Sequence, residues 1–187
     1  MTINDIKIEA LKLMFTNYNE DIHSVSELSN DDNYAAYIPS MNGAINRALA
    51  RLYAKRVIRK RFIPLPTDFA SCDDSMDIED AISITLTEAD KQYIRDRIAA
   101  ENPNLTAVEI EAKAIVEINN EEAKLHVYIP VDAQLLIPYY IKADLYEEDE
   151  PAIAAQARNY FEQALDDRWY DEEQEVVENV FRNGWLG

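Results

Sequence analysis

The fold of this chain is set by the stretch Ile137-Pro-Tyr-Tyr-Ile-Lys-Ala-Asp-Leu-Tyr-Glu-Glu-Asp-Glu-Pro-Ala-Ile-Ala-Ala-Gln-Ala-Arg-Asn-Tyr-Phe-Glu-Gln-Ala-Leu165. A block of four acids, 147 to 150, stands directly before Pro151. Proline suits the first turn of a helix because the N–H it lacks would have no partner there. Carboxylates at that end are stabilised by the helix dipole. These features predict a helix from about Pro151 to about Arg168, after an earlier one from about Pro138 to Tyr146.

The later helix is amphipathic. Its apolar residues recur at helical spacing and predict one stripe that packs on a bundle. The stripe consists of Ile153, Ala157, Tyr160, Phe161, Ala164 and Leu165.

Two more helices are predicted in the first quarter of the chain, one capped by Asn4 and a longer one capped by Ser40. The longer helix carries basic residues four positions apart, which therefore form one ridge opposite its apolar face. The ridge allows two uses. It pairs with acids of the same chain or of a neighbour, or it binds the phosphates of DNA. Its members are Arg47, Arg51, Lys55 and Arg59.

The middle of the chain changes to a period of two. Ile82, Ile84 and Leu86 predict a strand, and 114–118 with 125–129 predict a hairpin around the turn-like residues 119–122. A helix begins at Thr87 and ends near Asn102, whereas residues 106–112 fit either a helix or a strand. The predicted fold class is therefore α+β: a helical bundle with an inserted small antiparallel β-sheet excursion and an extended C-terminal tail.

The predicted organisation has four parts. Residues 1–61 form the N-terminal bundle helices, 62–132 the β-rich excursion with one inserted helix, 133–170 the C-terminal bundle helices, and 171–187 a tail. The tail follows an acidic run with large apolar groups that are expected to anchor on a partner. These groups are Val176, Val177, Val180, Phe181, Trp185 and Leu186.

Composition limits the classes of function. The 187 residues carry 36 acids and 18 bases, a net charge of −18, which opposes attraction to nucleic acid and to anionic lipid. A single cysteine, Cys72, excludes an intrachain disulfide and fits a reducing compartment. No signal peptide or membrane span is predicted, so the protein is expected to be soluble and made in the cytoplasm.

The sequence shows no catalytic signature, and we expect no enzyme activity, no cofactor and no metal. His23 and His126 are isolated, and the acids beside Cys72 should raise its pKa and leave the thiol inert. One acidic cluster is the basis for an alternative, a metal-dependent enzyme or regulator that binds calcium or magnesium. The cluster comprises Asp73, Asp74, Asp77, Glu79 and Asp80.

Two segments resemble the head-to-tail adaptor, or head completion, proteins of tailed bacteriophages. One is Tyr37-Ile-Pro-Ser-Met-Asn-Gly-Ala-Ile-Asn-Arg-Ala48. The other is Tyr140-Ile-Lys-Ala-Asp-Leu-Tyr-Glu-Glu-Asp-Glu-Pro-Ala152 with Ala157-Arg-Asn-Tyr-Phe-Glu162 after it. The resemblance implies a helical bundle with a β-containing excursion, assembled as a ring, commonly dodecameric, beneath the portal. It also implies that the C-terminal region docks on the portal and that DNA passes through the ring.

The sequence therefore favours a structural virion protein at the head-tail junction. Its expected partners are further copies of itself, the portal and a downstream tail or head-completion protein. DNA is expected to pass without specific binding, and no membrane is involved. At the interfaces we expect the basic ridge to meet the acids of 171–178 and a second acidic group. A DNA-binding module that uses the ridge is the remaining alternative. The second acidic group is Glu147, Glu148, Asp149 and Glu150.

Overall fold

The computed structural model describes residues 1–15, 23–28, 31 and 34–183, with side chains up to Trp169. The described part is helical and contains no strand; its one β-type pairing is an isolated antiparallel bridge between Thr2 and Asp77. The predicted α+β class, with an inserted antiparallel sheet, is therefore wrong. The helices are α1 (Ile3–Met14), α2 (Val25–Leu28), α3 (Ile38–Ala54), η1 (Phe69–Ser71), α4 (Ile78–Ile82), α5 (Glu88–Glu101), α6 (Ala107–Leu125), α7 (Val131–Gln134), α8 (Ile137–Leu145) and α9 (Pro151–Asn183).

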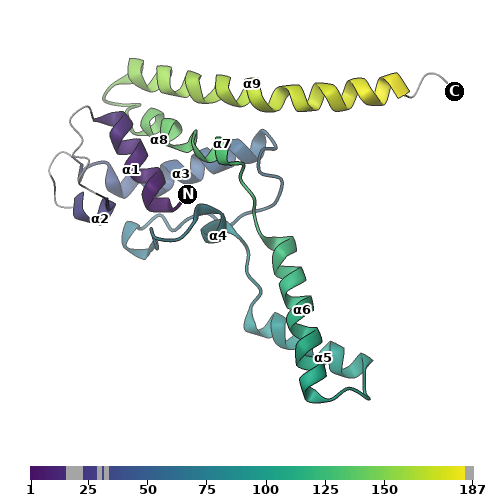
Figure 1. Cartoon of the computed structure of the whole chain (residues 1–187). Coiled ribbons are helices and arrows are strands. Elements are labelled where there is room, and N and C mark those ends of the chain that lie inside the picture. The colour runs from purple at the N-terminus through teal and green to yellow at the C-terminus, as the bar shows by residue number, and fades with distance from the viewer. Residues whose placement is uncertain (16–22, 29–30, 32–33, 184–187) are drawn as a thin grey trace.

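A bundle of α1, α3, α8 and α9 forms the body of the molecule (Figure 1). The short helix α8 lies at its centre and packs against each of the other three. Ile137 and Ile141 are fully buried, and the ring of Tyr140 packs edge-on against Phe161 of α9, with 5.0 Å between the ring centres. The aromatic and aliphatic run of the opening stretch thus supplies the middle of the core.

The predicted helices at 138–146 and from Pro151 are confirmed, and α9 continues further than expected, to Asn183. The side of α9 that faces the bundle is Ala154, Ala157, Phe161 and Leu165, all buried. Two members of the predicted apolar stripe, Ile153 and Tyr160, are instead exposed, because they flank this line rather than lie on it.

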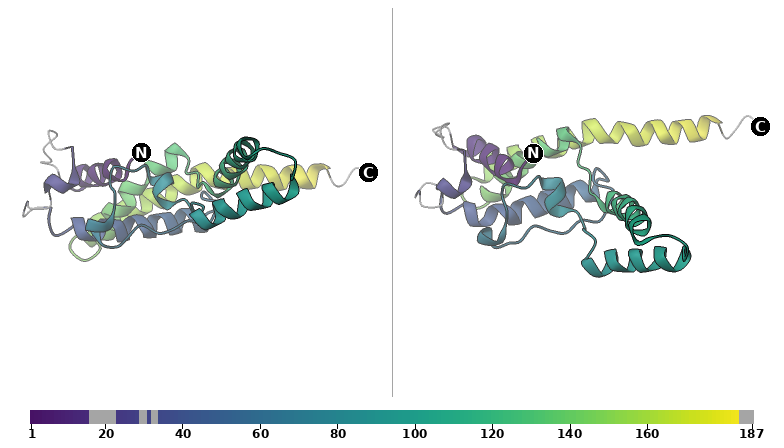
Figure 2. Two further views of the ribbon diagram at one scale, coloured as in Figure 1. Left: turned by 90° about the horizontal axis from the view of Figure 1, so that it is seen from below. Right: turned by 60° about the horizontal axis from the view of Figure 1, so that its bottom comes forward.

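Helices α5 and α6 form a hairpin that projects from the bundle, as Figure 1 and the right view of Figure 2 show. The hairpin has its own small core, made of Ile94, Ile98, Ala114 and Ile118. Two non-helical connections, 83–87 and 126–130, join it to the body. They are tied together where the Val127 N–H donates to the Ser83 hydroxyl at 2.8 Å.

Most residues of the predicted β-hairpin, 114–118 and 119–125, are helical. A capping box and the contact with α5 outweigh the alternation of apolar and polar residues that suggested strands. Thr106 and Glu109 form a capping box that starts α6, which also resolves the ambiguous residues 106–112 as helix. Ala114 and Ile118 then face α5 at helical spacing, whereas Val116, between them, is exposed. The predicted strand at 82–86 is also wrong, since Ile82 ends α4 and the following residues belong to a connection.

The helix predicted from Thr87 is confirmed as α5, and it also starts with a capping box, formed by Thr87 and Asp90. The pKa of Asp90 is lowered by hydrogen bonds from the Thr87 hydroxyl and backbone N–H, and that of Glu109 by hydrogen bonds from the Thr106 backbone N–H and hydroxyl. A lowered pKa in the folded state means that the stabilisation is present at neutral pH. It is lost as the pH falls through the lowered pKa.

The starts of α1 and α3 differ from the predictions. Thr2 rather than Asn4 caps α1, and the Asn4 side chain instead donates to the His23 carbonyl and accepts from the Val25 N–H. Helix α3 begins at Ile38, before Ser40, with a proline in its first turn.

The end of α3 is set by Arg56, which has a φ of 60°. Its N–H donates to the Tyr53 carbonyl, and the Val57 N–H donates to the Leu52 carbonyl. This is the Schellman arrangement, in which glycine normally occupies the left-handed position. As a result the chain leaves the helix before Arg59, so the predicted ridge does not continue along one helix to that residue.

We expect glycine at position 56 to be more stabilising than alanine by about 1 kcal/mol, because a Cβ is disfavoured at positive φ. Both variants lose the arginine side chain, so their difference isolates the backbone effect. Chemical unfolding of R56G and R56A measures it. At Ala50, an exposed position in the interior of α3, A50G should have the opposite sign and cost roughly 0.5–1 kcal/mol. Equal stability of R56G and R56A would contradict the backbone assignment.

Candidate functional site

Three cations of the basic ridge pair with acids of the same chain. Arg47 of α3 forms a two-point ion pair with Asp144 of α8. Arg51 likewise holds Glu162 of α9 through two nitrogens, at 2.6 and 2.5 Å.

The third pair joins Lys55 to Asp166 at 2.5 Å. Since Arg51 and Lys55 are four residues apart, as are Glu162 and Asp166, helices α3 and α9 run in the same direction.

These pairs position helices rather than present a charged face. Hydrogen bonds to the facing carboxylates are the main cause that raises the pKa of Arg47 and of Arg51. Both guanidinium groups are partly exposed, so each pair contributes little stability, typically below about 1 kcal/mol. Pairing within the chain, one of the two uses that the sequence left open, is therefore found for three members of the ridge.

The four acids before Pro151 lie at the exposed corner between α8 and α9. Glu147 pairs with Arg158 of α9, at 3.3 Å. Asp149 lies 3.5 Å from the Tyr37 hydroxyl, and burial, followed by this carboxylate, raises the pKa of Tyr37. Glu147 and Asp149 form these contacts away from the ridge, although the charge of Glu147 also helps to raise the pKa of Arg47. Contact between the ridge and the acids of another copy stays a prediction.

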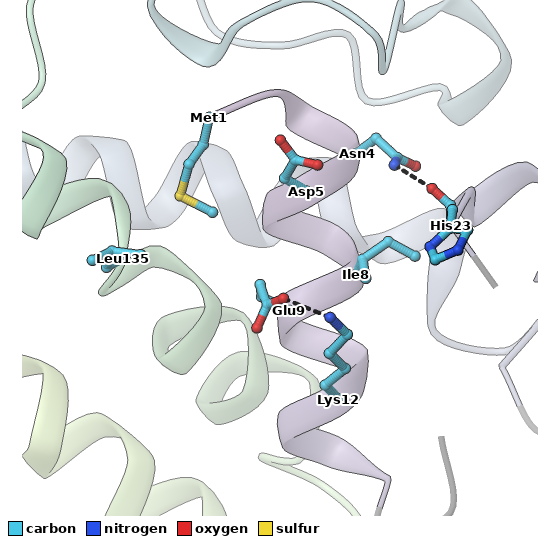
Figure 3. Close-up of a pocket in the computed structure, with 8 residues that line it drawn as sticks. All are labelled: Met1, Asn4, Asp5, Ile8, Glu9, Lys12, His23 and Leu135. Atoms are coloured by element: carbon cyan, nitrogen blue, oxygen red, sulfur yellow. Dashed lines mark hydrogen bonds and ion pairs between the residues drawn. The ribbon is translucent and has the colours of Figure 1, made fainter. Parts of the chain in front are cut away.

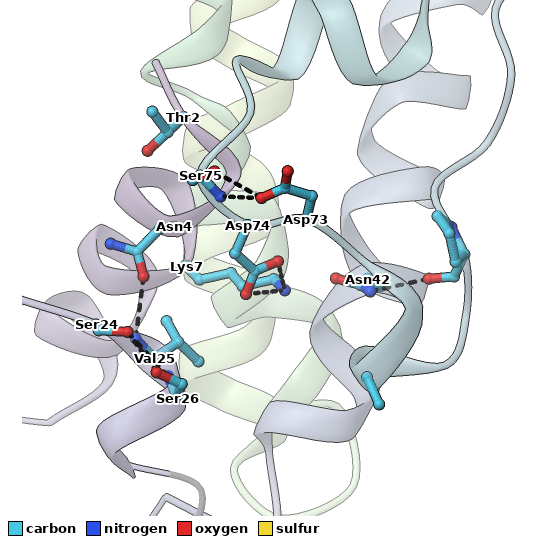
Figure 4. A network of polar contacts seen from close by, with 12 residues as sticks. Thr2, Asn4, Lys7, Ser24, Val25, Ser26, Asn42, Asp73, Asp74 and Ser75 are labelled. Atoms are coloured by element: carbon cyan, nitrogen blue, oxygen red, sulfur yellow. Dashed lines mark hydrogen bonds and ion pairs between the residues drawn. The ribbon is translucent and has the colours of Figure 1, made fainter.

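A buried ion pair connects α1 to the segment before α4 (Figure 4). Lys7 is fully buried, and its ammonium donates to both carboxylate oxygens of Asp74, at 2.7 and 2.9 Å. The same ammonium lies 4.7 Å from the centre of the Phe69 ring, a cation–π contact. Burial is the main cause that raises the pKa of the Cys72 thiol; the charge of Asp74 adds to it, whereas that of Lys7 opposes it. The direction is the expected one, but the main cause is burial and not the neighbouring acids.

The acidic residues considered as metal ligands are used separately. The Asp73 carboxylate accepts from Ser75, that of Asp74 is occupied by Lys7, and that of Glu79 accepts the Ile129 N–H at 2.5 Å. Over the described ranges no three or more His, Cys, Asp or Glu side chains are grouped to hold a metal ion. His126 ends α6, and its Nδ1 lies 3.1 Å from the Ser83 hydroxyl.

A shallow pocket lies along α1, and Figure 3 shows its lining. Its volume is about 410 Å³, in the range of ligand sites. Some of its polar groups bond to one another: Lys12 pairs with Glu9 at 2.8 Å, and Asn4 donates to the His23 carbonyl at 2.7 Å. No set of polar groups converges on a ligand, so the pocket is not a candidate active site. It is lined by Met1, Asn4, Asp5, Ile8, Glu9, Lys12, His23 and Leu135.

Comparison of the chain with protein-family models, with curated proteins and with solved structures gave no match. Among the helices of the described ranges, none has the length and apolar character that a membrane crossing requires.

The predicted anchoring residues lie outside the described side chains. Residues 176–183 belong to the backbone of α9, whereas Trp185 and Leu186 lie beyond the described residues. The sequence analysis missed the acids that pair with the ridge, Asp144, Glu162 and Asp166. Glu162 and Asp166 are four residues apart, as the cations of the ridge are. This equal spacing on two helices was the one signal in the sequence for their pairing.

Proposed function

We propose that this chain is a non-enzymatic structural protein of a tailed bacteriophage, which forms a ring that joins the portal to the tail and continues the DNA channel. The resemblance of the two segments described above suggests the family. In this proposal the excursion from the bundle is the helical hairpin α5–α6, in place of the sheet that the resemblance implied.

The observation that carries the proposal is the length of α9. Its described core contacts end with Trp169, which packs partly against the bundle. The helix continues for a further 14 residues, 170 to 183, which at 1.5 Å per residue is about 21 Å. Figure 1 shows this half of α9 extending past the other helices. A helix that extends so far past its own bundle is suited to reach a second protein.

The distribution of charge is consistent with a channel wall that does not hold DNA. The net charge is −18, and three of the four ridge cations are engaged by carboxylates of α8 and α9. Non-specific affinity for duplex DNA arises from cations that replace counterions on phosphates. Ridge cations already paired with carboxylates contribute little to such binding.

The proposal is tested by removing the extending half of α9. A chain that ends at Asp171 retains the described core, so we expect its unfolding midpoint and helical signal per residue to stay close to those of the full chain. We expect it to lose attachment to the portal ring of the same phage, viewed by electron microscopy of the two proteins mixed. The full chain should add a ring of density beneath the portal.

A second truncation, at Asn183, separates the helix from residues 184–187. It should attach more weakly than the full chain if Trp185 and Leu186 contribute to the anchor. Portal attachment that is unchanged by the truncation at Asp171 would refute the proposed docking segment. Absence of any ring density with the full chain would refute the proposed function.

A further inference from the structure

The α5–α6 hairpin joins the body through a narrow neck, made by the connections 83–87 and 126–130. Helix α6 ends at Leu125, and Val127 is already fully buried in the main core. On the other side Ile82 still belongs to the main core, whereas Leu86 packs against the separate core of the hairpin. The non-helical step between the two cores is therefore short: His126 on one side and residues 83–86 on the other.

The hydroxyl of Ser83 lies in the neck and has three partners. Its oxygen is 2.6 Å from the carbonyl oxygen of Glu79, 2.8 Å from the backbone nitrogen of Val127 and 3.1 Å from Nδ1 of His126. A hydroxyl donates one proton and accepts two hydrogen bonds. Since a carbonyl only accepts, the proton of Ser83 goes to Glu79. The two remaining partners must both donate, so Nδ1 of His126 has to carry a proton.

A second side chain of the body holds the end of α6. The ammonium of Lys60, in the connection that follows α3, donates to the carbonyls of Ala123 at 3.3 Å and His126 at 2.9 Å. The last carbonyls of a helix have no partner within the helix, and they form the negative end of its dipole. Lys60 therefore ties the carbonyl end of α6 to the body.

The hairpin is otherwise built to hold itself together. Its two helices pack mainly on one another and project away from the bundle (Figure 1). Each cation of α5 and α6 bonds to another group of the hairpin, so these charges do not fix its direction relative to the body. The bonds are Lys91 to Glu122, Arg95 to Glu111, Arg97 to Glu117, Lys113 to Asn102, and Lys124 to Glu121.

We propose that Ser83 and Lys60 form a latch that fixes the direction of the hairpin, which swings as one body when the latch is open. Hinges are a few residues at the ends of elements that absorb the change in φ and ψ. His126 and residues 84–86 have that position, between two cores that stay packed during the movement. The inference is independent of the proposed function, because neither a ring nor a portal enters it.

Double electron–electron resonance measures how widely the hairpin moves. One spin label is placed at V108C, at the end of α6 far from the neck, and the other at S40C on α3, in a chain that also carries C72A. Both label positions are exposed. With the latch intact we expect one narrow distribution of distances between the labels. In S83A/K60M its width should at least double, because the donors and the acceptor that hold the neck are gone.

The matched control is S75A/K124M, which also removes one serine hydroxyl and one lysine ammonium. Ser75 bonds to Asp73 and Lys124 to Glu121, both close in the sequence and outside the neck. We expect the control to keep the width of the wild type. A distribution for S83A/K60M as narrow as that of the control, or a wild type as broad as S83A/K60M, overturns the inference.

Nitrogen NMR of the imidazole tests the latch without a change in the neck. In H23Q the chain has His126 as its single histidine, and at a pH where the ring is neutral the proton should be found on Nδ1 rather than Nε2. A proton on Nε2 would mean that the Ser83 hydroxyl does not hold His126 as described, and it overturns the latch. This measurement decides the question even if S83A/K60M does not fold.

Discussion

Replacing Phe161 with alanine is expected to lower the free energy of unfolding by about 3–5 kcal/mol and to loosen α9 from the bundle. Phe161 is fully buried, and its ring packs edge-on against Tyr140 of the central helix α8. The substitution removes the transfer free energy of the ring and leaves a cavity at the α8–α9 contact. Since domains are typically stable by only 5–15 kcal/mol, this is a large fraction of the total.

Urea unfolding measures the change in the free energy of unfolding, and tryptophan fluorescence reports whether α9 stays packed on the bundle. With Trp185 replaced by phenylalanine, the signal comes from Trp169, which packs partly against the core. The matched control is Y160A, one position earlier, whose ring is half exposed and lies 4.4 Å from the Tyr139 ring. Loss of that pair should cost about 0.5–1.5 kcal/mol. A cost for F161A no greater than for Y160A would show that α9 is not held at this point.

Removal of the carboxylate at Asp74 is expected to destabilise the protein by about 3–5 kcal/mol, because it leaves the ammonium of Lys7 buried without its counter-charge. Lys7 is fully buried, and the lysine would retain only the Phe69 ring as a partner. The same segment is joined to α1 through backbone bonds, including one from the Asn4 N–H to the Asp74 carbonyl at 2.8 Å. D74A removes the side-chain ion pair and leaves these backbone bonds, so the segment should stay near α1 but become easier to cleave by a protease.

The double variant K7M/D74A separates a buried charge from a lost contact. Methionine has a similar length and no charge, so most of the stability lost in D74A should return. The measurement is the free energy of unfolding of the wild type, D74A and K7M/D74A, with proteolysis as a check on the segment around Asp74. Should the double variant be no more stable than D74A, the cost lies in the lost contacts and not in an uncompensated charge.

Prediction from the sequence succeeded where one local signal had a single interpretation. Pro151, preceded by acids, marked the first residue of α9, and Thr87 marked the cap of α5. It failed where the same residues fitted both the two-residue period of a strand and the 3.6-residue period of a helix. Ala114, Val116 and Ile118 alternate, and the outer two are also four residues apart. Their assignment depended on α5 covering one side, which is tertiary information.

The candidate surfaces were foreseen only in part, for a similar reason. The ridge was visible from its spacing, but its end was not, because a left-handed turn at an arginine has no signal comparable to glycine. The choice between internal and external partners depended on where α8 and α9 place Asp144, Glu162 and Asp166. The exposed apolar residues of α6 were missed for the same reason as the helix itself, since Val116 was assigned to a strand.

The separate core of the α5–α6 hairpin also has a dynamic consequence. Its amide hydrogens should exchange with solvent deuterium through local openings of this unit alone, while those of α3 and α8 wait for rarer openings of the whole bundle. Such a hierarchy would let the hairpin open and close many times while the body keeps its shape.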